Sequence, residues 1–298
     1  MRLSLIVWSR GLFLTGLLSL SLAHPRSAEA VQCGDTLSGD GTTVVLETDL
    51  TCTSLTAERA VTVEAKSAEA TAGVRLAGTV TLDLNGHTLS CGAGVQQGIH
   101  AVGAKVRNGT VRGCAIGVAA SGAFIAIQDM VFSGNVSIGL LVQGGQGGIY
   151  VNNTARENGS GFSFEDSSDD NVLLNNTATH NTAGGFGMEG ARNTLIGNTA
   201  SFNGGSGFVS VGEGDSRFIG NWAEGNSIGF DTGDDFRTEY SGNTAQQNTL
   251  AGFVIDSGKR LTVHDNVARA NGGDGFRIDS GIFQKQELFN NYAINNGG

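Results

Sequence analysis

The chain has 298 residues, of which 18 are Lys or Arg and 28 are Asp or Glu, so its formal net charge at pH 7 is −10. This acidic balance argues against nucleic acid or an anionic membrane surface as a partner. The chain also has 47 glycines and one proline, and its short β-branched runs, broken by Asn and Gly, indicate strands and turns rather than helical repeats.

Residues 1–30 are typical of a secretory signal peptide. Two arginines flank the start of the segment, an apolar run covers residues 11–23, and the sequence AEA at 28–30 fits a small-x-small cleavage site. The apolar run is too short to span a membrane, and no later segment qualifies. Cleavage after residue 30 leaves 15 basic and 27 acidic residues, and we expect an exported protein, periplasmic or extracellular.

The four cysteines all lie in the first half of the chain. Export favours disulfides, and the matching stretches "NGHTLSC" and "NGTVRGC" place Cys91 and Cys114 one repeat apart. We therefore predict the bridges Cys33–Cys52 and Cys91–Cys114, each contributing about 2–5 kcal/mol. A metal site would need a ligand-pair spacing that these cysteines lack. Residues 31–75 are then expected to form an N-terminal cap, and residues 76–298 the repeats.

Beyond the cap, the sequence repeats every 22 to 24 residues. Gly precedes Phe in six successive repeats, at Phe162, Phe186, Phe208, Phe230, Phe253 and Phe276. A second motif, Asn-x-Ala-x-x-Asn, begins at Asn153, Asn176, Asn198, Asn221, Asn243, Asn266 and Asn291. A fixed period of this length indicates a solenoid, and the Leu-x-x-Leu-x-Leu frame of leucine-rich repeats is missing.

Three short strands and three turns fill about 22 residues, which is one coil of a parallel β-helix. We predict an all-β solenoid of about nine or ten coils with three parallel sheets. Alternation places the Phe column and the repeated Ala inside, with successive rings about 4.8 Å apart. The repeated Asn residues are expected to occupy left-handed turns and to bond their neighbours in a ladder. The chain reaches Gly298 where the next Gly-Phe is due, so either further coils follow or something covers this sheet edge.

Three stretches carry a family resemblance: "TLDLNGHTLSCGAGVQQGIHAVG", "VRNGTVRGCAIGVAASG" and "NTLIGNTASFNGGSGF". They resemble the right-handed parallel β-helix repeat proteins, including NosD-like periplasmic proteins and the pectate-lyase-like superfamily. The segment "VQCGDTLSGDGTTVVLETDLTC" is similar to the N-terminal part of many exported bacterial members. The resemblance covers residues 33–298. It implies the fold and leaves the function open, because this fold hosts lyases, hydrolases, epimerases and adhesins.

In the pectinase-like relatives the substrate groove lies over the sheet that corresponds to the Gly-Phe strands, so the outward residues of that sheet are the candidate site. We expect a catalytic group of Asp231, Asp256, Arg277 and Asp279, with Glu165 and Glu189 in substrate binding. Carboxylates on adjacent strands would stand about 4.8 Å apart, close enough to raise a pKa or attract Ca²⁺. The alternative is a solvated acidic face that keeps a repeat protein soluble.

Metal chemistry has weaker support in the sequence. The acidic stretch "DTGDDF" at 231–236 is more typical of a turn than of a calcium loop, and the identity of any metal stays open. A copper role by analogy with NosD would need clustered Met or His donors. The cleaved chain keeps only Met130 and Met188, and its histidines are scattered.

Two further features favour binding. Trp222 replaces a Thr on a strand expected to be exposed, where its ring could stack on a sugar. An outward apolar ridge is expected from Val151, Leu174, Ile196 and Ile219, which favours a covering loop or self-association over a foreign ligand. We therefore expect polysaccharide binding along the Gly-Phe sheet with lyase or hydrolase activity. The alternative is a non-catalytic surface or scaffold protein that acts by protein–protein contact or self-association.

Overall fold

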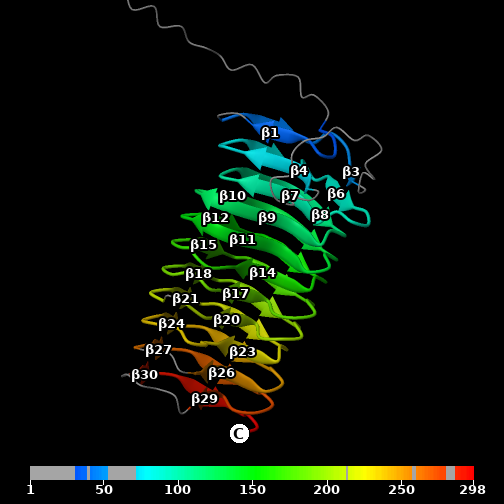
Figure 1. Cartoon of the computed structure of the whole chain (residues 1–298). Coiled ribbons are helices and arrows are strands. Elements are labelled where there is room, and N and C mark those ends of the chain that lie inside the picture. The colour runs from blue at the N-terminus through cyan, green and yellow to red at the C-terminus, as the bar shows by residue number, and fades with distance from the viewer. Residues whose placement is uncertain (1–30, 39–40, 53–71, 213, 257–259, 280–285) are drawn as a thin grey trace, which may run out of the picture.

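The computed structural model describes residues 31–38, 41–52, 72–212, 214–256, 260–279 and 286–298. The expected signal peptide and residues 53–71 of the expected cap lie outside these ranges, so both predictions stay untested. Within them the chain is all β and winds as a parallel β-helix, with the coils stacked in chain order (Figure 1). No helix in the described part of the chain is long and apolar enough to cross a membrane.

One face of the solenoid is an 11-stranded parallel sheet that contains the Gly-Phe strands and is called the Gly-Phe face below. From β7 to β29 it has nine strands, one for each coil, as the sequence predicts. Its strands are β1 (Thr36–Ser38), β4 (Ala72–Ala77), β7 (Gln97–Val102), β9 (Ile116–Ala123), β11 (Ile138–Gln146), β14 (Ser160–Phe164), β17 (Phe186–Met188), β20 (Phe208–Ser210), β23 (Ile228–Asp231), β26 (Ala251–Ile255) and β29 (Phe276–Ile278).

Each coil then crosses two more faces, which the long strands β8 (Lys105–Arg112) and β10 (Ala126–Ser133) join into one sheet. The second face holds β2 (Thr43–Val45), β5 (Thr81–Asp83), β12 (Ile149–Val151), β15 (Val172–Leu174), β18 (Thr194–Ile196), β21 (Arg217–Ile219), β24 (Glu239–Ser241), β27 (Thr262–His264) and β30 (Glu287–Phe289). The third face holds β3 (Leu50–Cys52), β6 (Thr88–Cys91), β13 (Thr154–Arg156), β16 (Thr177–Thr179), β19 (Thr199–Ser201), β22 (Trp222–Glu224), β25 (Thr244–Gln246), β28 (Val267–Arg269) and β31 (Tyr292–Ile294).

A column of phenylalanine rings fills the core behind the Gly-Phe face, as predicted. The rings of Phe186, Phe208 and Phe230 are about 1% exposed or less. Their centroids are 4.8 Å apart at each step, with interplanar angles of 4°. Burying one such side chain contributes roughly 1.5–3 kcal/mol, and each ring pair about 0.5–1.5 kcal/mol more. The repeated alanines from Ala155 to Ala268 are also fully buried.

The glycine before each phenylalanine is required by the close approach of successive coils. A Cβ atom on Gly207 would lie 2.8 Å from the carbonyl oxygen of Gly229 and 2.9 Å from the Asn226 amide nitrogen. Real Cβ atoms essentially never come so close to a neighbour. The Gly-Phe motif therefore combines a backbone contact that tolerates no side chain with a large ring beside it.

The repeated asparagines form buried ladders along two corners of the solenoid, as predicted. In the first ladder the Asn176 Nδ2 atom donates to Asn198 Oδ1 (3.0 Å) and to the carbonyl oxygen of Tyr150 (2.9 Å). The Asn176 backbone N–H donates to the same Asn198 oxygen (2.8 Å). The expected left-handed conformation is wrong for these residues: it belongs to the preceding one, such as Asn175 (φ 53°). The ladder residue turns its side chain into the corner, so its predecessor makes the bend.

Both predicted disulfides are confirmed. Cys33 is bonded to Cys52 with a Cα–Cα distance of 5.4 Å, and Cys91 to Cys114 with 4.9 Å. The second bridge joins adjacent coils, as the repeat alignment requires. Because residues 53–71 are not described, the boundary between cap and repeats near residue 75 stays a prediction.

Candidate functional site

The outer side of the Gly-Phe face carries the column that the sequence assigns to the site. Asp231 is in register with Val254, and Val254 with Arg277, so the three lie on successive strands β23, β26 and β29. Asp231 and Arg277 are half-buried. Val254 is only 2% exposed although it faces outward.

Four predicted catalytic residues come together at the C-terminal end of this face. The Arg277 Nη2 atom donates to Asp279 Oδ2 (3.3 Å), and Arg277 Nε lies 3.2 Å from Asp279 Oδ1. The charges of Asp256, Arg277 and Asp279 all act on the Asp231 carboxyl. The Asp256 backbone N–H donates to Thr232 Oγ1 (3.2 Å), which holds that residue at the end of β26.

Within this cluster, the surroundings of Asp231 raise the pKa of its carboxyl. Partial burial raises its pKa, and the negative charges of Asp256 and Asp279 raise it further. The Gly233 N–H, 3.3 Å from Asp231 Oδ1, and the positive charge of Arg277 oppose this rise in pKa. A carboxyl with a raised pKa is suited to proton transfer near neutral pH.

A second acidic group lies on the same face, further toward the N-terminus. The Glu165 Oε2 atom accepts a hydrogen bond from Gln143 Nε2 (2.6 Å). Burial raises the pKa of Glu189, and the charges of Asp166 and Glu165 add to the effect. The predicted binding residues Glu165 and Glu189 therefore do interact. Asp166 was not predicted, because it lies in the corner after β14 and the prediction counted only residues at fixed positions along the strands.

Trp222 does not belong to this site. It lies on β22 of the third face, because the third strand of each coil points to a different side of the solenoid. Its Nε1 atom donates to Glu224 Oε2 (3.2 Å), and the Arg269 guanidinium lies 5.6 Å from its ring centroid. A sugar bound by Trp222 would therefore lie on another face from one bound beside Asp231.

The predicted apolar ridge lies on the outer side of the second face. Val151, Leu174, Ile196 and Ile219 are in register on β12, β15, β18 and β21, and Ile196 is 37% exposed. Ile149, which is 52% exposed, and Val172 widen the ridge. Each lies two positions before a ridge residue on the same strand. Because side chains alternate between inside and outside along a strand, the pattern that predicts the ridge also predicts that these two face outward.

The acidic stretch at 231–236 does not converge on one point. Asp235 is 1% exposed, and its carboxylate accepts hydrogen bonds from Thr238 Oγ1 (2.8 Å) and Tyr240 OH (3.0 Å). Asp231 faces outward, and Asp234 is exposed. In the described ranges, no group of three or more His, Cys, Asp or Glu side chains is arranged to hold a metal ion. The expectation of Ca²⁺ stays a prediction.

The sequence matches two protein-family descriptions. Residues 81–239 match the family described as periplasmic copper-binding protein (NosD), and residues 189–298 match the right handed beta helix region. The chain belongs to the NosD family. No curated protein matches it in sequence.

Solved structures with the same fold include proteins that act on polysaccharide. The periplasmic alginate epimerase AlgG aligns with a TM-score of 0.59 and 13% identity over 87% of this chain and 73% of its own. The A-module of the Azotobacter vinelandii mannuronan C-5 epimerase AlgE4 gives 0.54 and 13% over 88% and 85%. The Dettilon tailspike protein gives 0.58 and 14% over 87% and 60%. At these identities the likeness establishes the fold alone.

The copper in the family description is not matched by a donor set in the described residues. All four cysteines are in disulfides, which removes them as thiolate ligands. Met130 and Met188 are each 1% exposed and pack in the core. His264 lies between Glu239 and Asp265, with its ring stacked on Phe289. These donors do not fit a copper site.

Proposed function

We propose that the protein is exported through its signal peptide and binds an acidic polysaccharide along the outer side of the Gly-Phe face. The carrying observation is the cluster of Asp231, Asp256, Arg277 and Asp279, in which a carboxyl of raised pKa lies near a guanidinium. The periplasmic description of the family and the two disulfides support export. The polysaccharide-acting proteins among its structural neighbours support the substrate class.

The reaction that suits this cluster best is β-elimination from a uronate chain. Arg277 pairs with the uronate carboxylate and withdraws charge as the neighbouring carbon loses its proton to the Asp231 carboxylate. The electron pair of that C–H bond forms a double bond, and the bond to the departing sugar oxygen breaks. That oxygen takes a proton from water. Hydrolysis by a pair of carboxylates is the second reaction open to the same residues.

A depolymerisation screen tests this proposal. The mature chain from residue 31 is incubated with uronate and neutral polysaccharides, with and without Ca²⁺. Elimination appears as ultraviolet absorbance of the unsaturated product, and hydrolysis as reducing ends without that absorbance. We expect Asp231→Asn to abolish turnover. The exposed Asp129, in β10 away from this face, gives a charge-matched control in Asp129→Asn, which should act as the unchanged protein does. Absence of product and of glycan affinity across the panel would reject the proposal.

A second candidate function is self-association through the apolar ridge. Its support is the exposure of Ile196 in the apolar column of the ridge and of Ile149 in the column beside it, since such patches commonly mark contact surfaces. Sedimentation velocity over a range of concentrations should show a dimer that Ile196→Lys disperses. Thr199→Lys, on the neighbouring third face, is the matched control. A monomer at every concentration would reject this role.

A further inference from the structure

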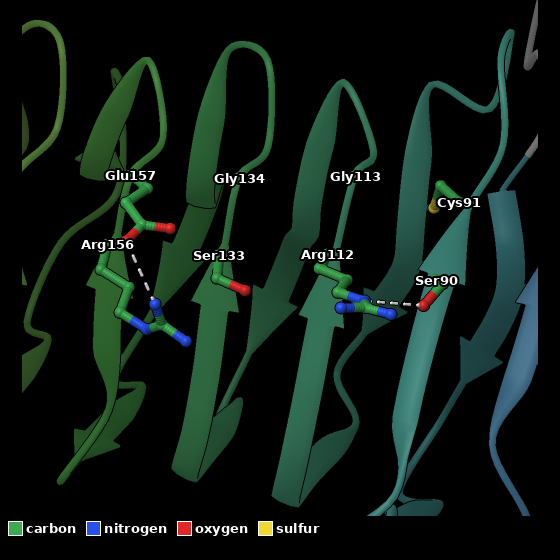
Figure 2. Close-up of a pocket in the computed structure, with 8 residues that line it drawn as sticks. All are labelled: Ser90, Cys91, Arg112, Gly113, Ser133, Gly134, Arg156 and Glu157. Carbon is green, nitrogen blue, oxygen red and sulfur yellow. Dashed lines mark hydrogen bonds and ion pairs between the residues drawn. The ribbon is translucent and has the colours of Figure 1, made fainter.

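A shallow hollow of about 470 Å³ lies on the third face, at the ends of four successive strands (Figure 2). In register across β6, β8, β10 and β13 stand Ser90, Arg112, Ser133 and Arg156. Figure 2 shows Ser133 between the two arginines, with all three side chains on the same side of the strands. The strand column therefore alternates hydroxyl and guanidinium groups.

The hollow exists because the corner residues beside it are small. Gly113 and Gly134 follow Arg112 and Ser133, and a Cβ atom at Gly134 would meet no heavy atom within 4 Å. Two coils further on, the same corner carries His180 and Phe202, whose rings lie 5.4 Å apart. Large corner side chains thus occupy the face there, and glycines leave it open here.

The two arginines keep much of their charge available. The Arg112 Nε atom donates to Ser90 Oγ (3.0 Å), a neutral partner, and the Arg112 charge also acts on the exposed Asp49 carboxylate. The Arg156 Nη1 atom lies 3.3 Å from Glu157 Oε1, but the two side chains are 46% and 63% exposed. An ion pair exposed to this extent contributes little binding energy. Elsewhere, arginines are paired more closely with carboxylates. Arg192 Nε lies 2.7 Å from Asp170 Oδ1, and Arg217 Nε lies 2.9 Å from Glu239 Oε2. A basic hollow thus stands out on a strongly acidic protein.

The spacing of the two cations limits what can bind. They are separated by the Ser133 strand, which places their backbones roughly 9–10 Å apart at the usual strand separation. Arg112 is turned toward Ser90, away from Arg156 (Figure 2), so the two guanidinium groups do not converge on one small anion. A chain of acidic sugars presents carboxylates at regular intervals along its length. Arginine forms paired hydrogen bonds with carboxylate groups, and the Ser90 and Ser133 hydroxyls lie where sugar hydroxyls would pass.

We propose that Arg112 and Arg156, with Ser133 between them, form a second binding site for an acidic polysaccharide, on a different face from the Asp231 cluster. The ligand class rests on the proposed function above, whereas the site rests on its own residues. Its role is to hold a long uronate chain on the solenoid without taking part in turnover. The remote basic site would also offset the repulsion between an acidic polymer and an acidic protein.

Binding of labelled oligogalacturonate and of oligoalginate of equal length, followed by fluorescence anisotropy, tests the site. We expect Arg112→Gln/Arg156→Gln to weaken at least one of them about tenfold and to reduce the salt dependence of binding. Gly134→Asn, which fills the hollow without a change of charge at a left-handed position that Asn tolerates, should weaken binding as well. Arg192→Gln/Arg237→Gln removes the same charge elsewhere and should leave affinity within about twofold.

The outcomes separate this site from the proposed function. Unchanged affinity in Arg112→Gln/Arg156→Gln, together with lost turnover in Asp231→Asn, would overturn the second site and keep the first. Equal affinity for monomeric galacturonate, or for a neutral oligosaccharide, would overturn the polymer assignment. Failure of the unchanged protein to bind either acidic oligomer would overturn both proposals. Retained turnover of short substrates in the double variant, with weaker binding of long ones, would support the anchoring role.

Discussion

The coils before and after residue 149 form the same solenoid in two different ways. In the earlier part the strands of the Gly-Phe face are long, with eight residues in β9 and nine in β11. In the later part β17 and β20 have three each. Short strands contribute fewer backbone hydrogen bonds per coil, so the later coils depend more on their corners and on the core.

The core column changes composition at the same boundary. Ile99, Val118 and Leu140 occupy the inward position of successive coils, and Phe162 continues the column. From there on each coil adds an aromatic ring that stacks on the last. Aliphatic side chains pack without a preferred stacking geometry, whereas the rings lie nearly parallel at 4.8 Å. The later coils thus repeat more strictly because one contact recurs.

The second asparagine ladder gives way to a disulfide at its N-terminal end. The Cys114 backbone N–H donates to Asn135 Oδ1 (3.1 Å), as the Asn135 N–H donates to Asn158 Oδ1 (2.9 Å). Cys114 therefore occupies the ladder position, and its bond to Cys91 takes over the link between coils. At the same corner of the solenoid, successive coils are therefore linked by a disulfide in the earlier half and by buried amide hydrogen bonds in the later half.

The largest expected effect comes from interrupting the ring column. Phe208→Ala removes a side chain stacked between Phe186 and Phe230 and should lower the free energy of unfolding by about 3–5 kcal/mol. Urea denaturation measures it. Val118→Ala in the aliphatic part, with fewer atoms removed, should cost less. Equal losses at the two positions would show that ring stacking gives the later coils no advantage.

The disulfide should come next. Cys91→Ser/Cys114→Ser should cost about 2–5 kcal/mol, with the loss concentrated in the coils before residue 149, because solenoid coils contact mainly their neighbours. Hydrogen exchange read by peptide separates the two regions. A uniform loss of protection along the whole chain would contradict this local role.

The asparagine ladder should give a smaller effect per residue. Asn203→Ala leaves the buried Asn181 N–H without its acceptor and removes the side-chain bond to the Ala178 carbonyl oxygen, at a cost of about 1–3 kcal/mol. Asn203→Ser keeps an acceptor, as Ser216 does when it accepts from the Asn193 N–H at 3.1 Å, and should cost less. An equal loss of stability in the two variants would mean that the missing hydrogen-bond acceptor is not its cause.

Features that recur once per coil are predictable from the sequence, because repetition reveals both their spacing and their direction. The Phe column, the ladders and the Cys91–Cys114 bridge are of this kind. The Asp231 cluster was also found by counting from Phe230. The Arg112–Arg156 pair was not, because the Asn-x-Ala-x-x-Asn motif that fixes the register begins only at Asn153.

Residues in corners of variable length cannot be placed by counting along the repeat. "DTGDDF" at 231–236 offers three carboxylates, and nothing in their order tells which one enters the core. The turn geometry places Asp235 inside, where Thr238 and Tyr240 supply its hydrogen bonds. Only the folded path of that corner distinguishes the buried acid from the exposed Asp234.

The smallest predicted effect concerns the buried Asp235 carboxyl and its dependence on pH. Burial raises its pKa above 3.8, against the opposing hydrogen bonds from Thr238, Ser210 and Tyr240. The folded state therefore keeps a proton at pH values where the unfolded chain has lost it. The stability from this group is present in full below the unfolded pKa and is lost as pH rises through the folded one.

Asp235→Asn removes this titration and keeps a side-chain oxygen for Thr238. We expect the difference in Tm between variant and unchanged protein to shift in favour of the variant as pH rises from about 4 toward 7. The absolute Tm is less informative, because the amide also changes the contact with Tyr240. Asp129→Asn, an exposed control of equal charge change, should show no such trend. A difference that stays constant with pH would mean that the Asp235 carboxyl titrates alike in the folded and unfolded chains, so that its hydrogen bonds offset its burial.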